Sequence, residues 1–496
     1  MKSSVENSNR VVQRLAATDF RAHVGLARRA CPGIVVLAAI VLIALPCWPQ
    51  KTPKKFADSI TLVDVTSRMH LSVPPLSHPP SADTFLKPIK SGEYSVDFAR
   101  RILIPAIGGS VVAADVDGSG YFDLYVIVPG GSNHYLRNLK NGTFAEDTSK
   151  AGLAGTGSDL SATFGDYDHS GHVSFFVAGL GGVTVYQSNG DGTFINVTEK
   201  TGIKIEPGEL ATSVLLFDAE GNGNPDLLVT VYTDLGKPPA KPSFVFPNDF
   251  ASATSRLYHN QGDGTFREIT SAAGLQENPG RTHKALAADF GHSGHIDLLL
   301  LRDNKPPVLF KNKGQGVFED RTWQAGGENW KYAYVDGQLS DFDHDGKLDL
   351  ALWSTIGNEV LMNQGDGKFE QAKTFPIVFA ANRAFGFHGA TADLTGDGYD
   401  DLLMVDNNSG WHFIANQRGE FALSDVKLPA ATAKSRTGSA KPALPPLSSL
   451  TPVRVDKSEK ITLIGIQTDG RIIALEPRQQ PVHATSRSSP SHPVNK

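Results

Sequence analysis

The sequence predicts an all-β protein folded as a closed ring of short four-stranded sheets, and three recurring patterns support this prediction. An acidic loop recurs six times at spacings of 51, 52, 71, 52 and 52 residues, with first residues Asp115, Asp166, Asp218, Asp289, Asp341 and Asp393. A glycine turn ending in Phe and a Val-Thr phrase recur in step with it. A repeat of this length indicates modules that bury their apolar faces against their neighbours.

The acidic loop is best preserved in the copy that starts at Asp341. Side-chain oxygens fall at loop positions 1, 3, 5 and 9, and Gly346 at position 6 suits a sharp turn with positive φ. The apolar run from Leu350 to Trp353 follows and predicts a buried strand. An EF-hand would place Glu at position 12, but this loop has Leu352 there. We therefore expect each loop to join two strands.

The second half of each unit is a hairpin. A Gly turn ends in Phe 28 or 29 residues after the first aspartate in five copies and 48 residues after it in the Asp218 copy, at Phe144, Phe194, Phe266, Phe318, Phe369 and Phe421. Asn-Gly or Asp-Gly between apolar runs is a strong hairpin signal. Four short antiparallel strands in about 50 residues are typical of one blade of a β-propeller.

The two ends of the repeat array complement each other. Leu62–Thr66 resembles the Val-Thr phrases that follow the Phe landmarks, and it has the same spacing to the next apolar residues, but no blade precedes it. At the far end, 453–455, 461–466 and 471–475 predict three strands without a fourth. Together they make a seventh blade closed by an N-terminal strand, which removes exposed sheet edges.

Oxygen atoms at alternate loop positions are the ligands that calcium prefers, so we expect several calcium ions. The predicted ligand sets are Asp341, Asp343, Asp345 and Asp349; Asp115, Asp117, Ser119 and Asp123; Asp393, Thr395, Asp397 and Asp401; and Asp218, Glu220, Asn222 and Asp226. Two loops depart from the pattern, so we expect weak or no calcium binding there. One has Asp166, Asp168 and Ser170 but Ser174 at position 9, and the other has Asp289, Ser293 and Asp297 but Gly291 at position 3. The alternative is a metal-free turn held by local hydrogen bonds.

The Asp-x-Asp-x-x-Gly-x-x-Asp-Leu loops, with the Gly-Asp-Gly-Thr-Phe and Val-Thr-x-x-x-Gly-Ile phrases, resemble the FG-GAP/VCBS repeat family. That family includes the integrin α-subunit propeller and many exported bacterial proteins. The resemblance covers residues 61–71 and about 103–476. It implies a propeller with calcium loops. It leaves the activity open, because members serve in adhesion and binding while the same repeats accompany several enzymes.

The N-terminal region predicts a membrane anchor. An apolar stretch of 18 residues runs from Cys31 to Trp48 and follows five arginines. It is just long enough to cross a bilayer, and the basic flank would remain cytoplasmic. We therefore expect residues 1–50 to be a cytoplasmic basic segment with a signal-anchor helix, and the propeller to lie in the periplasm or outside the cell. A cleaved signal peptide is the alternative.

The remaining organisation follows from composition. We expect a stalk at 51–60, the propeller at 61–476 with flexible stretches at 72–95 and 431–452, and a disordered tail at 477–496. The two cysteines, Cys31 and Cys47, bound the apolar stretch, so the exported part would have no disulfide. A net charge of −5 without a basic stripe argues against nucleic acid as a partner.

Two classes of function fit these features. The first is a binding, adhesion or scaffold module for an unknown protein or glycan. Its predicted contacts are Phe244 and Phe246 in the third-blade insertion, and His283 and His388 near the axis. The alternative is an extracytoplasmic enzyme, polysaccharide-active or quinone-dependent, that uses the central funnel. No Gly-x-Ser-x-Gly or His-Glu-x-x-His motif occurs, so we assign no catalytic residue and favour binding.

Overall fold

The computed structural model describes residues 59–76, 104, 109–237, 250–275, 280–327, 330, 333–354, 357–375, 388–405, 410–429, 447–458 and 460–479. All of them lie within one compact unit, residues 54–496. This described part is all-β, with five four-stranded sheets and one eight-stranded sheet. Two helical turns, α5 (Thr148–Ala151) and α6 (Thr198–Thr201), are the α-helices assigned among its named elements.

The first four-stranded sheet consists of β2 (Ser110–Ala114), β3 (Asp123–Ile127), β4 (His134–Asn138) and β5 (Phe144–Glu146), in that order. The next four sheets repeat it as β6 (Asp159–Gly165), β7 (Ser174–Gly179), β8 (Gly182–Ser188) and β9 (Phe194–Asn196); β10 (Glu209–Phe217), β11 (Asp226–Asp234), β12 (Arg256–Asn260) and β13 (Phe266–Glu268); β14 (Thr282–Ala288), β15 (Asp297–Arg302), β16 (Val308–Asn312) and β17 (Phe318–Asp320); and β18 (Tyr334–Ser340), β19 (Asp349–Ser354), β20 (Asn358–Gly365) and β21 (Lys368–Phe375).

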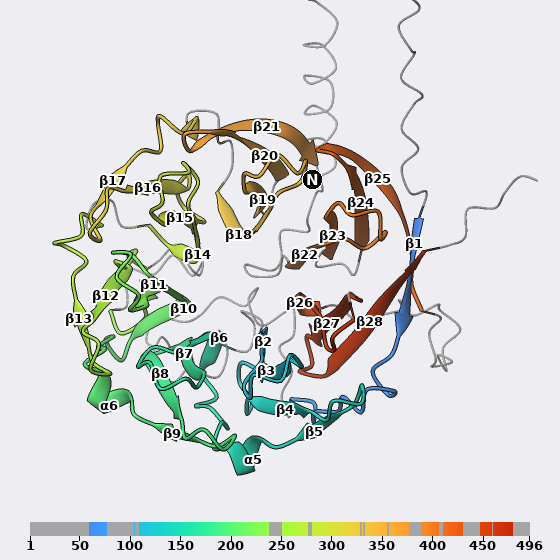
Figure 1. The fold of residues 1–496 in the computed structure, drawn as a ribbon, viewed down its shortest axis with the longest axis horizontal. Coiled ribbons are helices and arrows are strands. Elements are labelled where there is room, and N and C mark those ends of the chain that lie inside the picture. Colours follow the sequence, from blue (N-terminus) through green and yellow to red (C-terminus); the bar gives the residue numbers. More distant parts are fainter. Residues whose placement is uncertain are drawn as a thin grey trace, which may run out of the picture. The chain divides into compact units, whose positions relative to one another are not determined.

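The eight-stranded sheet contains β22 (His388–Ala392), β23 (Asp401–Val405), β24 (Trp411–Gln417) and β25 (Glu420–Lys427), followed by β1 (Ser59–Asp64), β28 (Ile472–Gln479), β27 (Thr462–Gln467) and β26 (Leu447–Val453). Its two ends are inner strands, and β25, β1 and β28 lie at the rim (Figure 1). It is thus two four-stranded sets joined at their outer edges.

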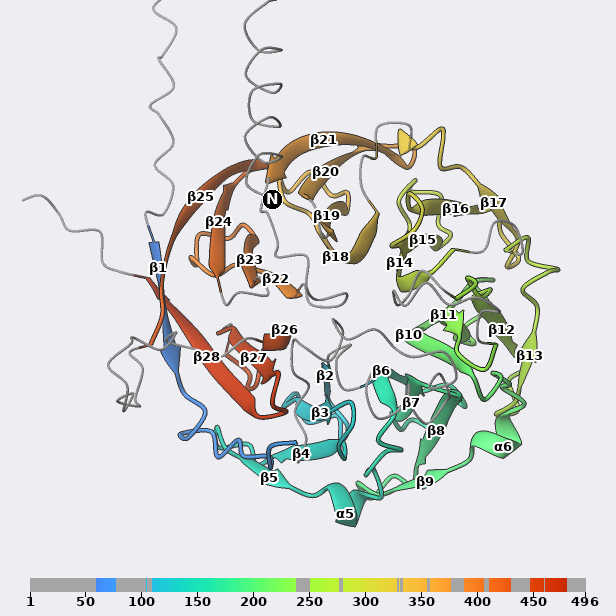
Figure 2. The same cartoon turned by 180° about the vertical axis from the view of Figure 1, so that it is seen from behind.

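The sheets stand side by side in a ring (Figures 1 and 2). Each inner strand contacts the next, in the order β2, β6, β10, β14, β18, β22 and β26, and β26 contacts β2. Because every sheet faces a neighbour on both sides, its second strand is buried almost throughout, as in β15 and β19. The apolar core lies between sheets: Leu299 and Leu301 pack with Leu350 and Leu352. This burial explains why the second strands form continuous apolar runs in the sequence.

The ring closes through β1, as the sequence predicts. Residues Ile60–Asp64 pair antiparallel with β28. The Thr66 hydroxyl accepts the Ala474 N–H at 2.8 Å, just as the Thr148 hydroxyl accepts the Tyr135 N–H at 2.7 Å in the first sheet. This shared contact explains the register match of the Val-Thr phrases. A parallel pairing of Ser59–Thr61 with β25 was not predicted.

Three predicted bounds are wrong. β1 begins at Ser59, inside the segment predicted to be a stalk, and β28 continues to Gln479, beyond the predicted propeller end. β26 begins at Leu447, inside the predicted 431–452 linker. Its serines and Pro452 suggest a linker, but Leu447, Leu450 and Val453 are buried in the core.

The predicted anchor in 1–50, residues 77–95 and 431–446 of the flexible stretches, and residues 480–496 of the tail lie outside the described residues. Among the residues that the structure describes, no helix is long and apolar enough to cross a membrane.

Deleting residues 57–71 should open the ring. Ile60 and Leu62 are fully buried, so their removal should cost about 3–6 kcal/mol, and the freed edges of β25 and β28 should promote aggregation. Urea unfolding and size-exclusion chromatography measure both effects. Truncation after Gln479 is the control, since it keeps every described strand. A monomeric deletion variant with unchanged stability would show that β1 does not support the ring.

Candidate functional site

The six acidic loops share one hydrogen-bonding pattern. In the Asp341 loop, one carboxylate oxygen accepts the Asp345 N–H at 3.0 Å and the other accepts the Gly346 N–H at 2.9 Å. The first aspartate of every other loop accepts the N–H groups of positions 5 and 6 in the same way, at Asp115, Asp166, Asp218, Asp289 and Asp393. The local hydrogen bonds expected of a metal-free turn are therefore present in all six loops, including the Asp166 and Asp289 loops, which depart from the acidic pattern.

Two positions of each loop require a left-handed backbone. Position 6 is glycine in all six copies, with φ between 79° and 91°. Position 4 also has positive φ, and it is occupied by Gly118, Gly221 and Gly396 or by His169, His292 and His344. Histidine is among the non-glycine residues enriched in this region. Sequence reasoning missed position 4, although the alternation of Gly and His was visible there.

The Asp341 loop gathers the most negative charge. Carboxylate oxygens of Asp341, Asp343 and Asp345 lie within 4.8 Å of one another, the one group of at least three possible metal ligands found among the described residues. Lys347 forms an ion pair with Asp345, and its hydrogen bond is the main reason that the pKa of Asp345 is lowered. One lysine does not balance three carboxylates. The hard, anionic oxygen donors therefore fit a calcium ion.

The Asp115 loop carries its own cation. Lys140 Nζ lies 2.8 Å from an Asp117 carboxylate oxygen. Burial raises the pKa of Asp117, but hydrogen bonds from Lys140 and Ser119 lower it more strongly, so the net pKa lies below its usual value. The Ser119 hydroxyl accepts the Tyr121 N–H at 3.3 Å. In this loop the side-chain ammonium group of Lys140 therefore occupies the carboxylate of Asp117, which the sequence predicts to be a metal ligand.

The other loops also use their predicted ligands within the protein. Glu220 lies 3.2 Å from His259, and the Asn222 amide oxygen accepts the Asn224 N–H. Asp168 accepts a hydrogen bond from Gln187, and Asp397 accepts the Tyr399 N–H. The remaining predicted ligands show the same local bonding: the Ser170 and Ser293 side chains contact their own loops, and the backbone of Thr395 binds Asp401.

The aspartate at position 9 is an anchor beneath the loop. In the Asp341 loop, Asp349 accepts the Asn363 N–H at 2.7 Å and the Phe342 N–H at 2.9 Å, and its side chain is buried. Burial raises the pKa of Asp349 to about 7, and that of Asp401 likewise. The same N–H contact to the third strand is made by Asp123, Asp226, Asp297 and Asp401. None of these four, nor Asp349, belongs to the three-carboxylate group.

An asparagine on the third strand completes this anchor and ties neighbouring sheets together. The Asn363 amide donates to the Leu348 carbonyl of its own sheet at 3.2 Å and to the Phe290 carbonyl of the preceding loop at 3.0 Å. Four other asparagines donate to a neighbouring unit in the same way, from Asn138 to Val455, Asn260 to Tyr167, Asn312 to Ala219 and Asn416 to Phe342. Sequence reasoning missed this contact, although the five contact asparagines each lie five or six residues before a Phe landmark.

The second sheet has a reduced version of this anchor. Ser174 replaces the aspartate, and Ser188 replaces the asparagine. The Ser188 N–H donates to the Ser174 hydroxyl at 3.2 Å. Because serine replaces both residues, the N–H of the third strand still has a side-chain acceptor on the second strand, but there is no amide to reach the neighbouring sheet.

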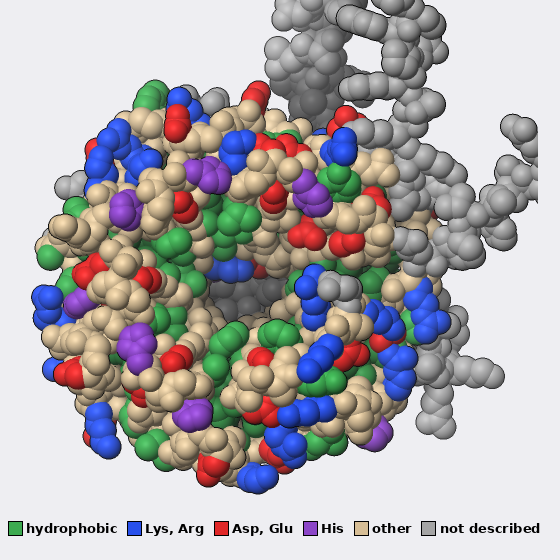
Figure 3. Space-filling model, viewed as in Figure 1, with side chains coloured by type: hydrophobic (Ala, Val, Ile, Leu, Met, Phe, Trp, Pro, Cys, Tyr) green, Lys and Arg blue, Asp and Glu red, His purple; other side chains and the backbone are tan. Residues whose placement is uncertain are grey.

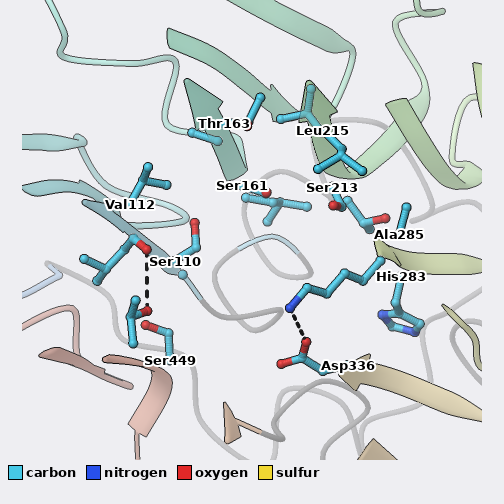
Figure 4. A pocket seen from close by; sticks show the side chains of 18 of the residues that line it. Ser110, Val112, Ser161, Thr163, Ser213, Leu215, His283, Ala285, Asp336 and Ser449 are labelled. Carbon is cyan, nitrogen blue, oxygen red and sulfur yellow. Dashed lines mark hydrogen bonds and ion pairs between the residues drawn. The ribbon is translucent and has the colours of Figure 1, made fainter. Parts of the chain in front are cut away.

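A cavity of about 460 Å³ opens at the axis of the ring, lined by inner strands (Figure 4). The face seen in Figure 3 is hollowed at its centre, with hydrophobic side chains around the hollow and charged groups and histidines over the surrounding ring. Lys284 Nζ lies 2.6 Å from Asp336 across two neighbouring inner strands of the cavity wall.

The predicted contact residues have different positions. Phe244 and Phe246 lie outside the described residues, as does the side chain of His388 at the start of β22. His283 is at the cavity wall, 3.3 Å from Asp303. Burial would raise the pKa of Asp303, but His283 and its other polar neighbours bring it below the usual value. His283 thus belongs to a largely buried polar network.

Comparison with known proteins identifies the class of repeat. A family model described as FG-GAP-like repeat matches residues 115–177, 166–229, 289–352 and 341–404. The chain therefore contains FG-GAP-like repeats over these residues, as the resemblance seen in its loops implies.

Particular relatives are more distant. Cartilage acidic protein 1 of Xenopus tropicalis is 25% identical over 329 residues, covering 61% of this chain and 48% of that protein. The human protein of the same name is 25% identical over 163 residues, covering 31% of this chain and 24% of that protein. The chain thus spans about half or less of these curated relatives.

Among solved structures, a lectin of Agrocybe aegerita matches with a TM-score of 0.42 and 20% identity, over 64% of this chain and 79% of the lectin. A lectin of Burkholderia pseudomallei matches with a TM-score of 0.39 and 11% identity, over 75% and 93% of the two chains.

Replacing Asn312 by Ala should weaken the link between neighbouring sheets. The change leaves the buried Ala219 carbonyl and the part-buried Ile296 carbonyl without their amide donor, so the free energy of unfolding should fall by about 2–4 kcal/mol in urea titrations. Ser188→Ala is the matched control, since the residue at that position does not reach the neighbouring sheet, and it should cost less than about 1 kcal/mol. Equal losses in the two variants would contradict a linking role for the amide.

Proposed function

We propose that this chain is a seven-bladed β-propeller, stabilised by calcium, that acts as a binding, adhesion or scaffold module. The observation that carries the proposal is the complete circle of inner-strand contacts from β2 to β26 and back to β2. A closed circle leaves no inner edge and holds the connecting loops on a rigid frame. Binding residues are often placed on loops of such frames.

Calcium would be held first at the Asp341 loop. Asp341, Asp343 and Asp345 would supply carboxylate oxygens, and the Lys347 carbonyl would be a further ligand. An ion there would offset the repulsion among three carboxylates. At the Asp115 loop an ion would have to displace Lys140. We therefore rank the Asp341 loop above the Asp115, Asp218 and Asp393 loops.

Export and membrane anchoring belong to the same proposal. They rest on the apolar stretch from Cys31 to Trp48 and its arginine-rich flank. The partner surface would include the third-blade insertion with Phe244 and Phe246, and an unknown protein or glycan would bind it. Binding is favoured over an enzymatic role for the central funnel because the cavity wall presents mainly serine, threonine and aliphatic side chains, and its lysine is already paired with Asp336.

Removal of calcium should lower the melting temperature of the wild-type protein. Saturation at about 100 times the dissociation constant would contribute about 2.7 kcal/mol, which corresponds to a shift of several degrees. Changing both Asp343 and Asp345 to Ala should remove part of this response. In chelator the double variant should melt no lower than wild type, since it lacks the unbalanced charge.

Asp168→Ala is the control for this experiment. That loop has Ser174 at position 9 and is expected to contribute little, so the calcium response should remain. Identical melting curves of the wild-type protein with calcium and with chelator would refute the calcium proposal.

Replacing residues 237–250 by a short Gly/Ser turn should abolish capture of the physiological partner while the calcium-dependent melting shift persists. A matched replacement of the tail 480–496 should leave capture unchanged. Binding to candidate proteins and glycans is measured by surface plasmon resonance with the purified full chain. Undiminished capture by the insertion variant would place the contact surface elsewhere.

A further inference from the structure

One level of the axial cavity is built from equivalent positions of the inner strands. In five of the six repeats, the residue five positions before the first loop aspartate lines the cavity at this level: Ser110, Ser161, Ser213, Lys284 and Asp336. β26 has no acidic loop after it, so its equivalent residue is found from the strand pairing. Val453 pairs with Thr462 as Ala114 pairs with Asp123, and Ser449 precedes Val453 by four residues just as Ser110 precedes Ala114. All six residues line the cavity (Figure 4).

A backbone irregularity precedes most of these side chains. The register shifts by one residue immediately before Ser161, Ser213, Lys284, Asp336 and Ser449, in β6, β10, β14, β18 and β26. A bulge bends a strand and changes the direction of the next side chain, and bulges are over-represented beside active sites. Five bulges at one level indicate that the cavity wall has a defined arrangement of polar groups.

Two hydroxyl groups at this level have no protein partner. Ser449 is 4% exposed, and its Oγ makes no hydrogen bond to the described residues. The Oγ of Ser110 is also buried and unpaired. A buried hydroxyl without a partner costs about 1–3 kcal/mol. A bound molecule that hydrogen-bonds to these hydroxyls would recover this cost.

The charged pair at this level is balanced and incompletely used. Lys284 Nζ donates to Asp336 at 2.6 Å and to the Gly337 carbonyl at 3.0 Å, so one of its three N–H groups remains. One oxygen of Asp336 accepts the Gly337 N–H as well as Lys284, which leaves the other as an acceptor. A donor and an acceptor therefore lie side by side with no net charge.

We propose that the axial cavity binds a neutral polyhydroxylated molecule of monosaccharide size. A pair of adjacent hydroxyls can accept from Lys284 and donate to Asp336 at the same time, and further hydroxyls can reach Ser110 and Ser449. Because the pair carries no net charge, neither an anion nor a cation gains a net attraction that would repay its desolvation. The volume of about 460 Å³ is within the range of about 300–1,000 Å³ found for small-molecule pockets. The site is separate from the acidic loops and the insertion, so it does not depend on the function proposed above.

Calorimetric titration of the full chain with glucose, galactose, mannitol and myo-inositol tests this site, with gluconate and glucosamine as charged probes. At least one neutral probe should bind and raise the melting temperature, and the charged probes should bind at least about tenfold more weakly. Lys284→Met and Asp336→Asn should each weaken binding by about tenfold or more. Binding of a glycan array at the same residues, with no free sugar bound, would identify a glycan terminus as the source of the ligand.

Ser449→Ala separates a ligand contact from a structural role. Removing an unpaired buried hydroxyl should leave the melting temperature of the free protein unchanged or higher, while affinity for the neutral probe should fall about fivefold. Lys313→Met breaks an exposed ion pair with Glu319 on the sheet β14–β17 and should leave affinity unchanged. Absence of binding both by every neutral probe and by the glycan array would overturn the proposal, whatever the outcome for calcium or partner capture. Equal affinity of wild type, Lys284→Met and Ser449→Ala would overturn it as well.

Discussion

The buried Asp–Asn contact is the interaction on which the ring depends. A sheet of four short strands has two apolar faces, and each must meet the next sheet at a fixed angle. Asp349 fixes the backbone of its own third strand, and the amide of Asn363 then bonds to carbonyls in its own sheet and in the preceding loop. Because the amide is buried, any displacement that breaks these bonds leaves polar groups unpaired. Apolar packing provides most of the burial, but this directional contact sets the position of one sheet against another.

Separation of the anchor from the loop explains why six loops can keep one shape with different charges. The first aspartate bonds to N–H groups within the loop, and the ninth residue bonds to the strand beneath. The side chains at positions 3 and 5 make local hydrogen bonds, such as those accepted by Asp343 and Asn222, and these positions vary among carboxylate, amide, hydroxyl and, at position 3, glycine. In the Asp115 loop a carboxylate is paired with Lys140, whereas the Asp341 loop brings three carboxylates together, and both loops have the same backbone hydrogen bonds. The charge at these positions can therefore vary from loop to loop without altering the ring.

Sequence reasoning could predict what local pattern determines. Loop spacing, hairpin turns and apolar runs predict the strands and their order, and the Thr66 phrase predicts how the ring closes. What it missed depends on partners distant in sequence. The Asn312 side chain reaches Ala219, 93 residues away. Likewise, β25 pairs with β1 across most of the chain. Most of β26, Leu447–Pro452, was assigned to a linker because small polar residues facing a cavity resemble one.

The axis of the ring is where packing imposes the weakest constraint. Farther out, both faces of a sheet press against neighbours, and the second strands are accordingly apolar along almost their full length. At the inner strands the sheets converge on a common cavity, so side chains such as Ser161 and Ser213 line open space as well as neighbouring sheets. Large apolar groups gain little from such a position, and serine, lysine and aspartate can occupy it without disturbing the core. Equivalent positions in successive sheets can therefore differ in chemistry while the fold stays the same, and the ion pair between β14 and β18 makes the ring asymmetric at its centre.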